Sequence, residues 1–522
     1  MDDLLLGLDI GTSGSKAVLL DTAGRVVATA TAEYALATPR PLWAEQDPAD
    51  WWTACVAVIR QVLAAPGVQP AAVRGVGLSG QMHGLVLLDG AGAVLRPCIL
   101  WNDGRSGPQC AAITAQLGLP RLLEWIANPV LPGFSAPKLL WVRDHEPDVY
   151  ARVAQVLLPK DYVRYCLTGA YATEVSDASG TALLDVQNRR WSAAMLDALD
   201  VPAAWLPPVY ESSAISARVS AAAAAVTGLP LGLPVVGGAG DQAAQAVGSG
   251  IVQQGVVSVT LGTSGVVFAA TDRFRLEPQG RLHAFCHAIP GAWHVMGVML
   301  SAGGSLRWYR DTLGQSEVAQ AAAQGIDSYE LLTAEAATTP PGAEGLLFLP
   351  YLSGERTPYS DPDARGVFFG LTLRHRKAHL TRAVLEGVTY GLRDSLELLR
   401  ALGVEITQVR ASGGGAASPL WRQILADVLE SEIVLTNSTA GAAFGAALLA
   451  GVGVGLYPDV PAACAATIRV TERVTPGPAA RIYADYYPHY RALYPTLAPH
   501  FQALGTTVAD SAEAERAATE RP

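Results

Sequence analysis

Two copies of a Gly-Thr-Ser-Gly turn, at residues 11–14 and 262–265, are the first feature of this chain that could do chemistry. Each turn follows an apolar run typical of a strand and leads into a second such run. The turn exposes successive backbone N–H groups and hydroxyls, which bind anionic oxygens without a basic side chain. One copy alone is typical of an ordinary hairpin, but two copies predict that different phosphates of one nucleotide are held. The residues expected to hold them are Gly11, Thr12, Ser13, Lys16, Gly262, Thr263 and Ser264.

An aspartate, Asp9, stands at the end of the apolar run before the first turn. Strands disfavour Asp, and apolar surroundings penalise its charge, so folding alone explains it poorly. Beside a phosphate-binding turn, a carboxylate could hold Mg²⁺ directly or through water. The second copy has Thr260 at the matching place, which predicts a metal-side acid in one half only.

A second aspartate, Asp241, follows a glycine turn within residues 235–248 and opens a short helix. One interpretation is an N-cap, a common role for Asp. The other is a carboxylate that faces a ligand beyond the strand ends and accepts a hydroxyl proton as that oxygen attacks a γ-phosphate. Together, Asp9 and Asp241 would supply the metal site and the base. A third glycine cluster at 412–418 could pass close to an adenine or ribose, although alone it indicates only a loop.

Alternating strand and helix signals must position these residues. Residues 4–10, 15–21 and 26–34 are typical of strands, and 47–64 of a helix capped by Asp47. This pattern predicts an α/β or α+β fold with helices covering sheets. Because strand, turn and strand recur, we expect two similar halves, at 1–250 and 251–504. The small, polar residues 505–522 predict a flexible tail.

Composition excludes several classes of protein. Half of the residues are hydrophobic and 16% are charged, which excludes wholesale disorder. The net charge of −10, with no basic block, argues against nucleic acid and anionic membranes as partners. The apolar stretch 440–457 contains five glycines and is predicted to be a close-packed core helix and not a membrane span. The absence of a secretory signal and the six scattered cysteines predict a cytoplasmic protein.

Longer motifs give the chain a resemblance to the FGGY carbohydrate kinases. Both signatures of that family are matched, by GFSAPKLLWVRDH at 133–145 and GVFFGLTLRHRKAHLTRAVLE at 366–386. The matching motifs extend from residue 4 to about 450. Within the family, QMHG at 81–84 and WNDGR at 101–105 resemble the bacterial xylulose kinases (xylulokinases).

The resemblance implies two actin-like domains, each with a ribonuclease-H-like mixed sheet, and an active site in the cleft between them. It implies phosphorylation of D-xylulose to D-xylulose 5-phosphate by ATP with Mg²⁺. Asp241 would be the base, and the metal site would contain Asp9 with Asp241 beside it. A homodimer would follow by analogy. The sugar would contact Met82, His83, Trp101, Asp103, Asp241 and Gln242, and the adenosine would border Gly414, Gly415 and Ser418.

The residues also leave alternative functions open. Many xylulose kinases have Asn after the base, whereas this chain has Gln242, which keeps the amide but is longer by a methylene. A kinase for another ketose or a sugar alcohol, such as ribulose, is therefore the first alternative. A non-catalytic ATP switch of the actin or Hsp70 type is a remote one. Without its motif, His83 would be interpreted as a core histidine bonded to backbone.

Overall fold

The computed structural model describes residues 3–437 and 441–519. The chain forms two compact units, and each of them is discontinuous in sequence. The predicted halves were continuous, so the structure differs from them in returning two later segments to the first unit. The first unit consists of Met1–Gln254, Ala270–Val295 and Thr436–Arg469, and the second of Gly255–Ala269, Met296–Leu435 and Val470–Pro522.

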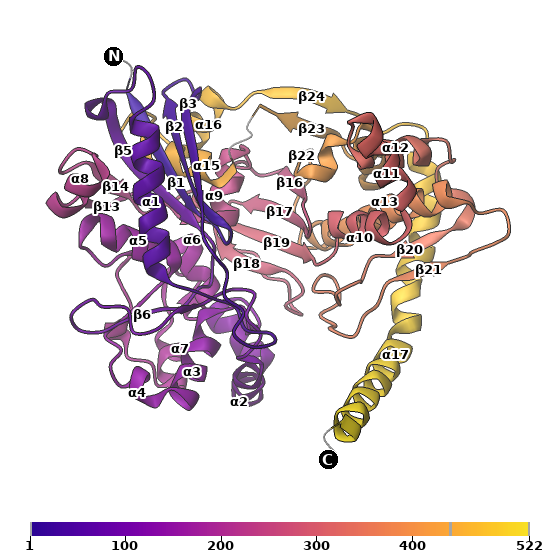
Figure 1. Cartoon of the computed structure of the whole chain (residues 1–522), viewed down its shortest axis with the longest axis horizontal. Helices are drawn as coiled ribbons and strands as arrows, with labels where there is room; N and C mark the ends of the chain where they lie inside the picture. Colours follow the sequence, from indigo (N-terminus) through magenta and orange to yellow (C-terminus); the bar gives the residue numbers. More distant parts are fainter. Residues whose placement is uncertain (1–2, 438–440, 520–522) are drawn as a thin grey trace. The chain divides into compact units, whose positions relative to one another are not determined.

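A mixed sheet forms the centre of the first unit, with the strand order β13-β14-β5-β1-β2-β3 (Figure 1). β1 pairs antiparallel with β2 and parallel with β5, and β15 pairs parallel with the end of β5. The strands are β1 (Leu4–Ile10), β2 (Gly14–Asp21), β3 (Val26–Glu33), β5 (Val73–Gly80), β13 (Ile215–Arg218), β14 (Pro234–Val236) and β15 (Ala239–Gly240).

Alternate residues of β1 point into two separate apolar cores, because successive side chains of a strand face opposite sides. Leu6 and Leu8 pack with helix α1 (Pro48–Leu63) on one face. Leu5 packs on the other face with helix α15 (Gly441–Gly453). Asp9 shares its side of the strand with Leu5, so β1 directs this carboxylate toward the α15 side.

The predicted helix at 47–64 is confirmed as α1, in which Asp47 caps the backbone N–H of Ala49 at 2.9 Å. The other helices of this unit are α2 (Gly107–Ile126), α3 (Ser135–His145), α4 (Pro147–Tyr150), α5 (Pro159–Thr168), α6 (Val175–Ala178), α7 (Ala193–Leu199), α8 (Ala221–Thr227), α9 (Asp241–Gly248) and α16 (Val460–Thr467). Its short strands are β4 (Glu45–Gln46), β6 (Val86–Leu88), β7 (Cys98–Ile99), β8 (Gln155–Leu157), β9 (Thr173–Glu174), β10 (Leu184–Asp185), β11 (Arg190–Trp191), β12 (Val209–Tyr210) and β18 (His283–Cys286).

The second unit repeats this topology, with the strand order β19-β17-β16-β22-β23-β24. Its first strand, β16, pairs antiparallel with β17 across the second GTSG turn and parallel with β22, as β1 does with β2 and β5. The predicted α/β fold, with a mixed sheet in each half, is therefore confirmed. The strands are β16 (Val256–Leu261), β17 (Gly265–Thr271), β19 (Trp293–Met299), β22 (Gln408–Ser412), β23 (Ile433–Thr436), β24 (Val470–Val474), β20 (Leu347–Leu349) and β21 (Val367–Phe369).

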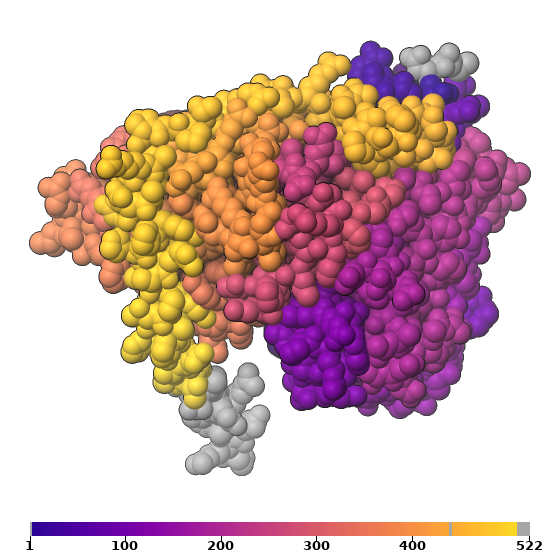
Figure 2. Space-filling view, turned by 180° about the vertical axis from the view of Figure 1, so that it is seen from behind, coloured from indigo at the N-terminus to yellow at the C-terminus, as the bar shows by residue number. Residues whose placement is uncertain are grey.

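Six helices belong to the described part of the second unit, and the longest, α17, lies along its surface before extending away from it (Figures 1 and 2). The predicted flexible tail at 505–522 is helical as far as Thr519, and residues 520–522 lie outside the described residues. The six helices are α10 (Gly303–Leu313), α11 (Gln315–Gln324), α12 (Ser328–Ala337), α13 (Lys377–Ala401), α14 (Pro419–Leu429) and α17 (Ala480–Thr519).

Helix α15 packs unusually closely against the elements that carry Asp9 and Asp241. A Cβ atom on Gly445 would lie 1.9 Å from the carbonyl oxygen of Ala244 in α9, and one on Gly7 of β1 would lie 1.9 Å from the carbonyl oxygen of Ala443. The predicted core helix is confirmed over Gly441–Gly453, and its glycines let backbones touch. No helix among the described residues is long and apolar enough to cross a membrane.

Replacing Gly445 by Ala is expected to lower the free energy of unfolding by roughly 3 kcal/mol, because the new methyl forces α9 and α15 apart. Urea unfolding followed by circular dichroism measures this change. Gly107→Ala is the matched control, since a Cβ there meets nothing within 4 Å. Equal stability of the two variants would contradict the close packing.

Candidate active site

The predicted catalytic residues lie at the carboxyl ends of three neighbouring parallel strands of the first unit. In β1, Asp9 is in register with Ser79 of β5, and Gly240 of β15 is in register with Gly80. Asp241 follows Gly240 directly and begins α9. The sheet therefore gathers two acids that are 232 positions apart in the sequence at one edge.

Asp9 lies in a setting suited to a cation. Burial raises the pKa of Asp9 to about 6, although the nearby Ser79 hydroxyl and Lys16 ammonium lower it. Lys16 is directly opposite Asp9 on β2, so the two side chains share a face. Within the part of the chain that the structure describes, the buried Oδ1 atom of Asp9 has no hydrogen-bond partner. A buried carboxylate oxygen without a donor leaves a place for a ligand.

Asp241 is not the N-cap of its helix. Gly240 occupies the cap position, and Asp241 is the first residue of α9. Its Oδ1 atom accepts from the backbone N–H of Gln242 at 2.7 Å. Burial raises the pKa of Asp241 to about 7, and the charge of Asp9 adds to this rise. A carboxyl group with a pKa near neutrality suits a general base.

His83 is held in a conformation that bulky residues rarely adopt, with a φ of 70°. Its Nδ1 donates to the carbonyl oxygen of Gly180 at 2.7 Å, so Nε2 of the neutral ring is an acceptor. The ring stacks on Phe134 with centroids 4.9 Å apart, and the Lys138 ammonium donates to the His83 carbonyl at 3.0 Å. Such strained residues cluster at functional sites, and this one lies in the turn after β5, the strand that pairs with the ends of β1 and β15.

Met82 precedes His83 in the sequence and packs against Gly240, the residue before Asp241. A Cβ atom on Gly240 would lie 3.0 Å from Sδ of Met82, and one on Gly180 would lie 2.5 Å from the His83 ring. The structure therefore places Met82 against the residue before Asp241. Gly180 was not predicted as part of the site, because nothing in the sequence distinguishes it from the other glycines.

A relay of hydrogen bonds connects the first GTSG turn to Trp101. The indole N–H of Trp101 donates to the hydroxyl of Thr12 at 3.0 Å, and that hydroxyl donates to Oε1 of Gln81 at 3.0 Å. Gln81 then donates to Oε1 of Gln46 at 3.0 Å, and Gln46 returns to the carbonyl of Thr12 at 2.7 Å. Both glutamines are buried. Gln81 belongs to the QMHG motif, but neither glutamine side chain was predicted as part of the site.

Asp103 is buried, and donors within the protein occupy both of its oxygens. Its Oδ1 accepts from the backbone N–H of Arg105 at 2.9 Å, and Oδ2 accepts from the guanidinium at 2.7 Å and from the backbone N–H of Ala44 at 2.6 Å. A contact between Asp103 and a sugar stays a prediction. Its evident structural effect is to hold Arg105.

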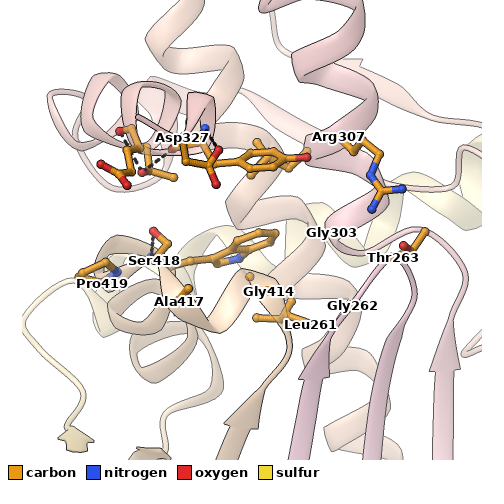
Figure 3. A pocket seen from close by; sticks show the side chains of 16 residues that line it. Leu261, Gly262, Thr263, Gly303, Arg307, Asp327, Gly414, Ala417, Ser418 and Pro419 are labelled. Carbon is orange, nitrogen blue, oxygen red and sulfur yellow. Dashed lines mark hydrogen bonds between the residues drawn. The ribbon is translucent and has the colours of Figure 1, made fainter. Parts of the chain in front are cut away.

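In the second unit, a pocket of about 460 Å³ opens beside the second GTSG turn (Figure 3). Segments far apart in sequence meet there: Gly262 and Thr263 from the turn, and Gly414, Gly415 and Ser418 from the third glycine cluster. The pocket has the size of a small-molecule site. Ser264, predicted with this group, does not line it. The hydroxyl of Ser418 caps α14 by accepting from the N–H of Trp421 at 3.3 Å.

Sequence reasoning missed the opposite wall of this pocket. Arg307 of α10 and Tyr329 of α12 line it, and Arg307 reaches toward the Thr263 turn in Figure 3. An arginine over an apolar pocket suits a ligand that is aromatic at one end and anionic at the other. Isolated Arg and Tyr residues on helices carry no motif, which is why no pattern indicated them.

Two α/β units of one topology, one with paired acids and one with a large pocket beside a glycine-rich turn, define the class of actin-like phosphotransferases. A solved structure of xylulose kinase from Rhodospirillum rubrum is similar, with a TM-score of 0.89 and 35% identity over 96% of this chain and all of the other.

The sequence comparisons define the family. The N-terminal domain of the FGGY family of carbohydrate kinases matches residues 4–248, and its C-terminal domain matches residues 257–454. The chain is 43% identical to xylulose kinase of Escherichia coli over 88% of its own length and 93% of the other. It is 44% identical to xylulose kinase of Klebsiella pneumoniae over 88% and 92%. The chain belongs to the FGGY family of carbohydrate kinases.

Proposed function

We propose that this kinase transfers the γ-phosphoryl group of ATP to the terminal hydroxyl of D-xylulose. The observation that carries the proposal is the pair Asp9 and Asp241 at one sheet edge, next to Met82 and His83. The family and the xylulose kinase names of its relatives support the choice of reaction.

Asp241 acts as the general base in this proposal. Its carboxylate takes the proton of the terminal hydroxyl, and that oxygen forms a bond to the γ-phosphorus as the bond to the β-phosphate oxygen breaks. ADP leaves, and the sugar becomes D-xylulose 5-phosphate. A hydroxyl attacks poorly unless its proton is removed as the bond forms, which is the contribution a base makes.

The two carboxylates fit a magnesium site. Mg²⁺ usually binds one or two carboxylates together with water and substrate phosphates, and so it needs no cage of protein ligands. The described residues contain no cluster of three or more acidic, His or Cys ligands, in keeping with this mode. The orphaned Oδ1 of Asp9 is the first candidate ligand, with Asp241 beside it. When bound, Mg²⁺ would neutralise phosphate charge that develops during transfer.

ATP would lie in the pocket of the second unit, with its adenosine near Gly414, Gly415 and Ser418. Gly262 and Thr263 of the second turn would hold some of its phosphates. The first GTSG turn would hold others. Because the Thr12 hydroxyl is engaged with Trp101 and Gln81, the Ser13 side chain is the better candidate of the two hydroxyls in this turn for that task.

The relay predicts that Gln81→Leu weakens nucleotide binding, by about fivefold to tenfold in Kd for Mg-ATP, because the shape of the first turn depends on it. Isothermal titration calorimetry measures this Kd. Gln109→Leu is the matched control, since Gln109 is also a buried glutamine but bonds to Asp144 at 3.0 Å in another part of the first unit. Unchanged affinity in Gln81→Leu would contradict this role.

The raised pKa of Asp241 predicts a pH dependence. Only the ionised carboxylate accepts a proton, so kcat/KM for the sugar should rise with pH and level off above about pH 7. At pH 6, about one-tenth of the base is ionised, and the rate should fall in proportion. Initial rates from pH 5.5 to 9 at saturating Mg-ATP test this, and a flat profile down to pH 5.5 would contradict it.

Sugar recognition would fall to His83, Trp101, Asp103 and Gln242, with Met82 against the carbon chain. A site built to bond hydroxyls rejects a sugar that lacks one of them, because its own polar groups then stay unpaired. The longer amide of Gln242 is the specific observation that favours the alternative, a kinase for ribulose, another ketose or a sugar alcohol.

Coupled ADP release, with D-xylulose, D-ribulose, L-xylulose, L-ribulose, xylitol and glycerol, decides between these substrates. The highest kcat/KM is expected for D-xylulose. Preference for another sugar would keep Asp9 and Asp241 but replace the substrate. ATP binding with no turnover of any sugar would favour the non-catalytic switch. The scattered cysteines favour a cytoplasmic enzyme, and the resemblance predicts a homodimer, which light scattering tests.

A further inference from the structure

The backbone that leads into Asp241, residues 237–240, contains three glycines, which restrict backbone conformation less than any other residue does. A base must nevertheless be held to within a fraction of an ångström. Contacts within the first unit supply this restraint. The N–H of Gly237 donates to Ala214 at 2.8 Å, and the N–H of Gly238 donates to Ser212 at 2.8 Å.

The anchor nearest to Asp241 is a side chain. The N–H of Gly240 donates to the hydroxyl of Ser176 at 3.1 Å. That hydroxyl in turn donates to Oε1 of Glu174 at 2.9 Å. A serine hydroxyl has one proton to give, so its bond to Glu174 turns a lone pair toward Gly240. Ser176 thus connects a buried carboxylate to the residue before the base.

Glu174 is itself fixed from all sides. Its carboxylate accepts from the N–H of Asp177 at 2.8 Å, from the N–H of Ser176 at 2.7 Å and from the hydroxyl of Ser212 at 2.9 Å. Its side chain is fully buried, and the Lys160 ammonium lies 3.6 Å away. A carboxylate with this many donors has one orientation only.

Buried charges behind Glu174 complete the support. Arg164 donates to the carbonyl of Gly237 and bonds to Asp161 at 2.6 Å, and Lys160 bonds to Asp161 at 2.7 Å. All three side chains are fully buried. Apolar side chains of similar volume often stabilise a fold as well as buried ion pairs do. Stability alone therefore gives little reason for these buried charges, whereas Arg164 bonds directly to the segment that carries Asp241.

We propose that Ser176, oriented by Glu174, is a positioning residue for Asp241, and that it sets the place of the base through the N–H of Gly240. This inference rests on the proposed role of Asp241. The segment TEVSDAS at 173–179 resembles no catalytic motif, so the sequence pattern does not indicate this role.

The test compares Ser176→Ala with Ser212→Ala in the full chain. Both variants remove a buried hydroxyl bonded to Glu174, but only the first leaves the N–H of Gly240 without an acceptor. Ser176→Ala is expected to lower kcat with D-xylulose about tenfold, with KM for ATP unchanged, because a displaced base is misaligned but ATP binds elsewhere. Ser212→Ala should stay within twofold of wild type, and Ser176→Thr, which keeps the hydroxyl, should recover most of the rate.

A second measurement needs no sugar. Hydrogen exchange of the backbone N–H of Gly240 should be faster in Ser176→Ala than in wild type, because that N–H loses its acceptor, while Ser212→Ala leaves the exchange rate unchanged. Equal effects of the two alanine variants, in kcat and in hydrogen exchange, would overturn the proposal. Full activity of Asp241→Asn would instead overturn the proposed base, and failure of the wild type on D-xylulose would overturn the proposed substrate. The hydrogen-exchange comparison still decides the inference in that case.

Discussion

Asp241→Asn is expected to lower kcat by about 10³-fold to 10⁴-fold, while the Kd for Mg-ATP stays within about threefold of wild type. Asn keeps the size of the side chain and a similar polarity but cannot accept the hydroxyl proton. Stopped-flow or coupled-assay rates give kcat, and calorimetry gives Kd. Gln242→Asn is the control at the next position, and it should change sugar preference and leave most of the maximal rate.

The same substitution should stabilise the protein. The folded-state pKa of Asp241 is raised from 3.8 to about 7, so its contribution to stability is present at low pH and lost as the pH rises through that interval. At pH 8 the ionised, partly buried carboxylate is a net cost, at most about 4 kcal/mol. Asp241→Asn should therefore unfold at higher urea than wild type at pH 8, and at equal urea near pH 4. Loss of stability at pH 8 would show that the charge is compensated within the apoprotein.

Asp9→Asn is expected to lower kcat by about 10²-fold to 10³-fold and to raise the Mg²⁺ concentration needed for half-maximal rate. Folding does not require a carboxylate at this position. The equivalent residue of the second unit is Thr260, which bonds to the hydroxyl of Ser412 at 3.1 Å, whereas Asp9 has a buried oxygen without a partner. A magnesium titration at fixed ATP measures the effect, with the exposed Asp50→Asn as a control.

Asp9→Asn should also move the pH profile of whatever activity remains. The negative charge of Asp9 contributes to the raised pKa of Asp241. Its removal should shift the acidic limb of kcat/KM toward lower pH, because the remaining carboxyl group then ionises more easily. A limb that stays at the wild-type pH would mean that the two acids do not interact, and would contradict their pairing at the sheet edge.

The local pattern of the chain was enough to identify the elements that carry the site. Hydrophobic periodicity, helix capping and composition act over a few residues. They were enough to predict the strand before each GTSG turn, the helix after Asp47 and the glycine-rich helix at 441–453. Repetition of strand, turn and strand also predicted two α/β halves, and β16 pairs with β17 and β22 as β1 pairs with β2 and β5. Asp9 and Asp241 were identifiable because a carboxylate at a strand end is poorly explained by folding.

Residues that act through contacts between distant segments were not identifiable. Gln46 and Gln81 hold the Thr12 turn, Ser176 holds Gly240, and Arg307 lines the pocket of the second unit. Each of these is a common residue type without a spacing rule. Its role depends on which carbonyl, hydroxyl or N–H the folded chain brings within about 3 Å.

The sequence by itself determined which residue types could hold phosphate, metal and proton, because that chemistry belongs to the side chains and to glycine-rich backbone. It also determined the class of fold, because hydrophobic period is a local property. Only the tertiary structure decided that Asp241 begins α9 without capping it, that Asp103 bonds to Arg105, and that later segments return to the first unit. These facts depend on the register of parallel strands and on side-chain packing, which join residues that no local pattern relates.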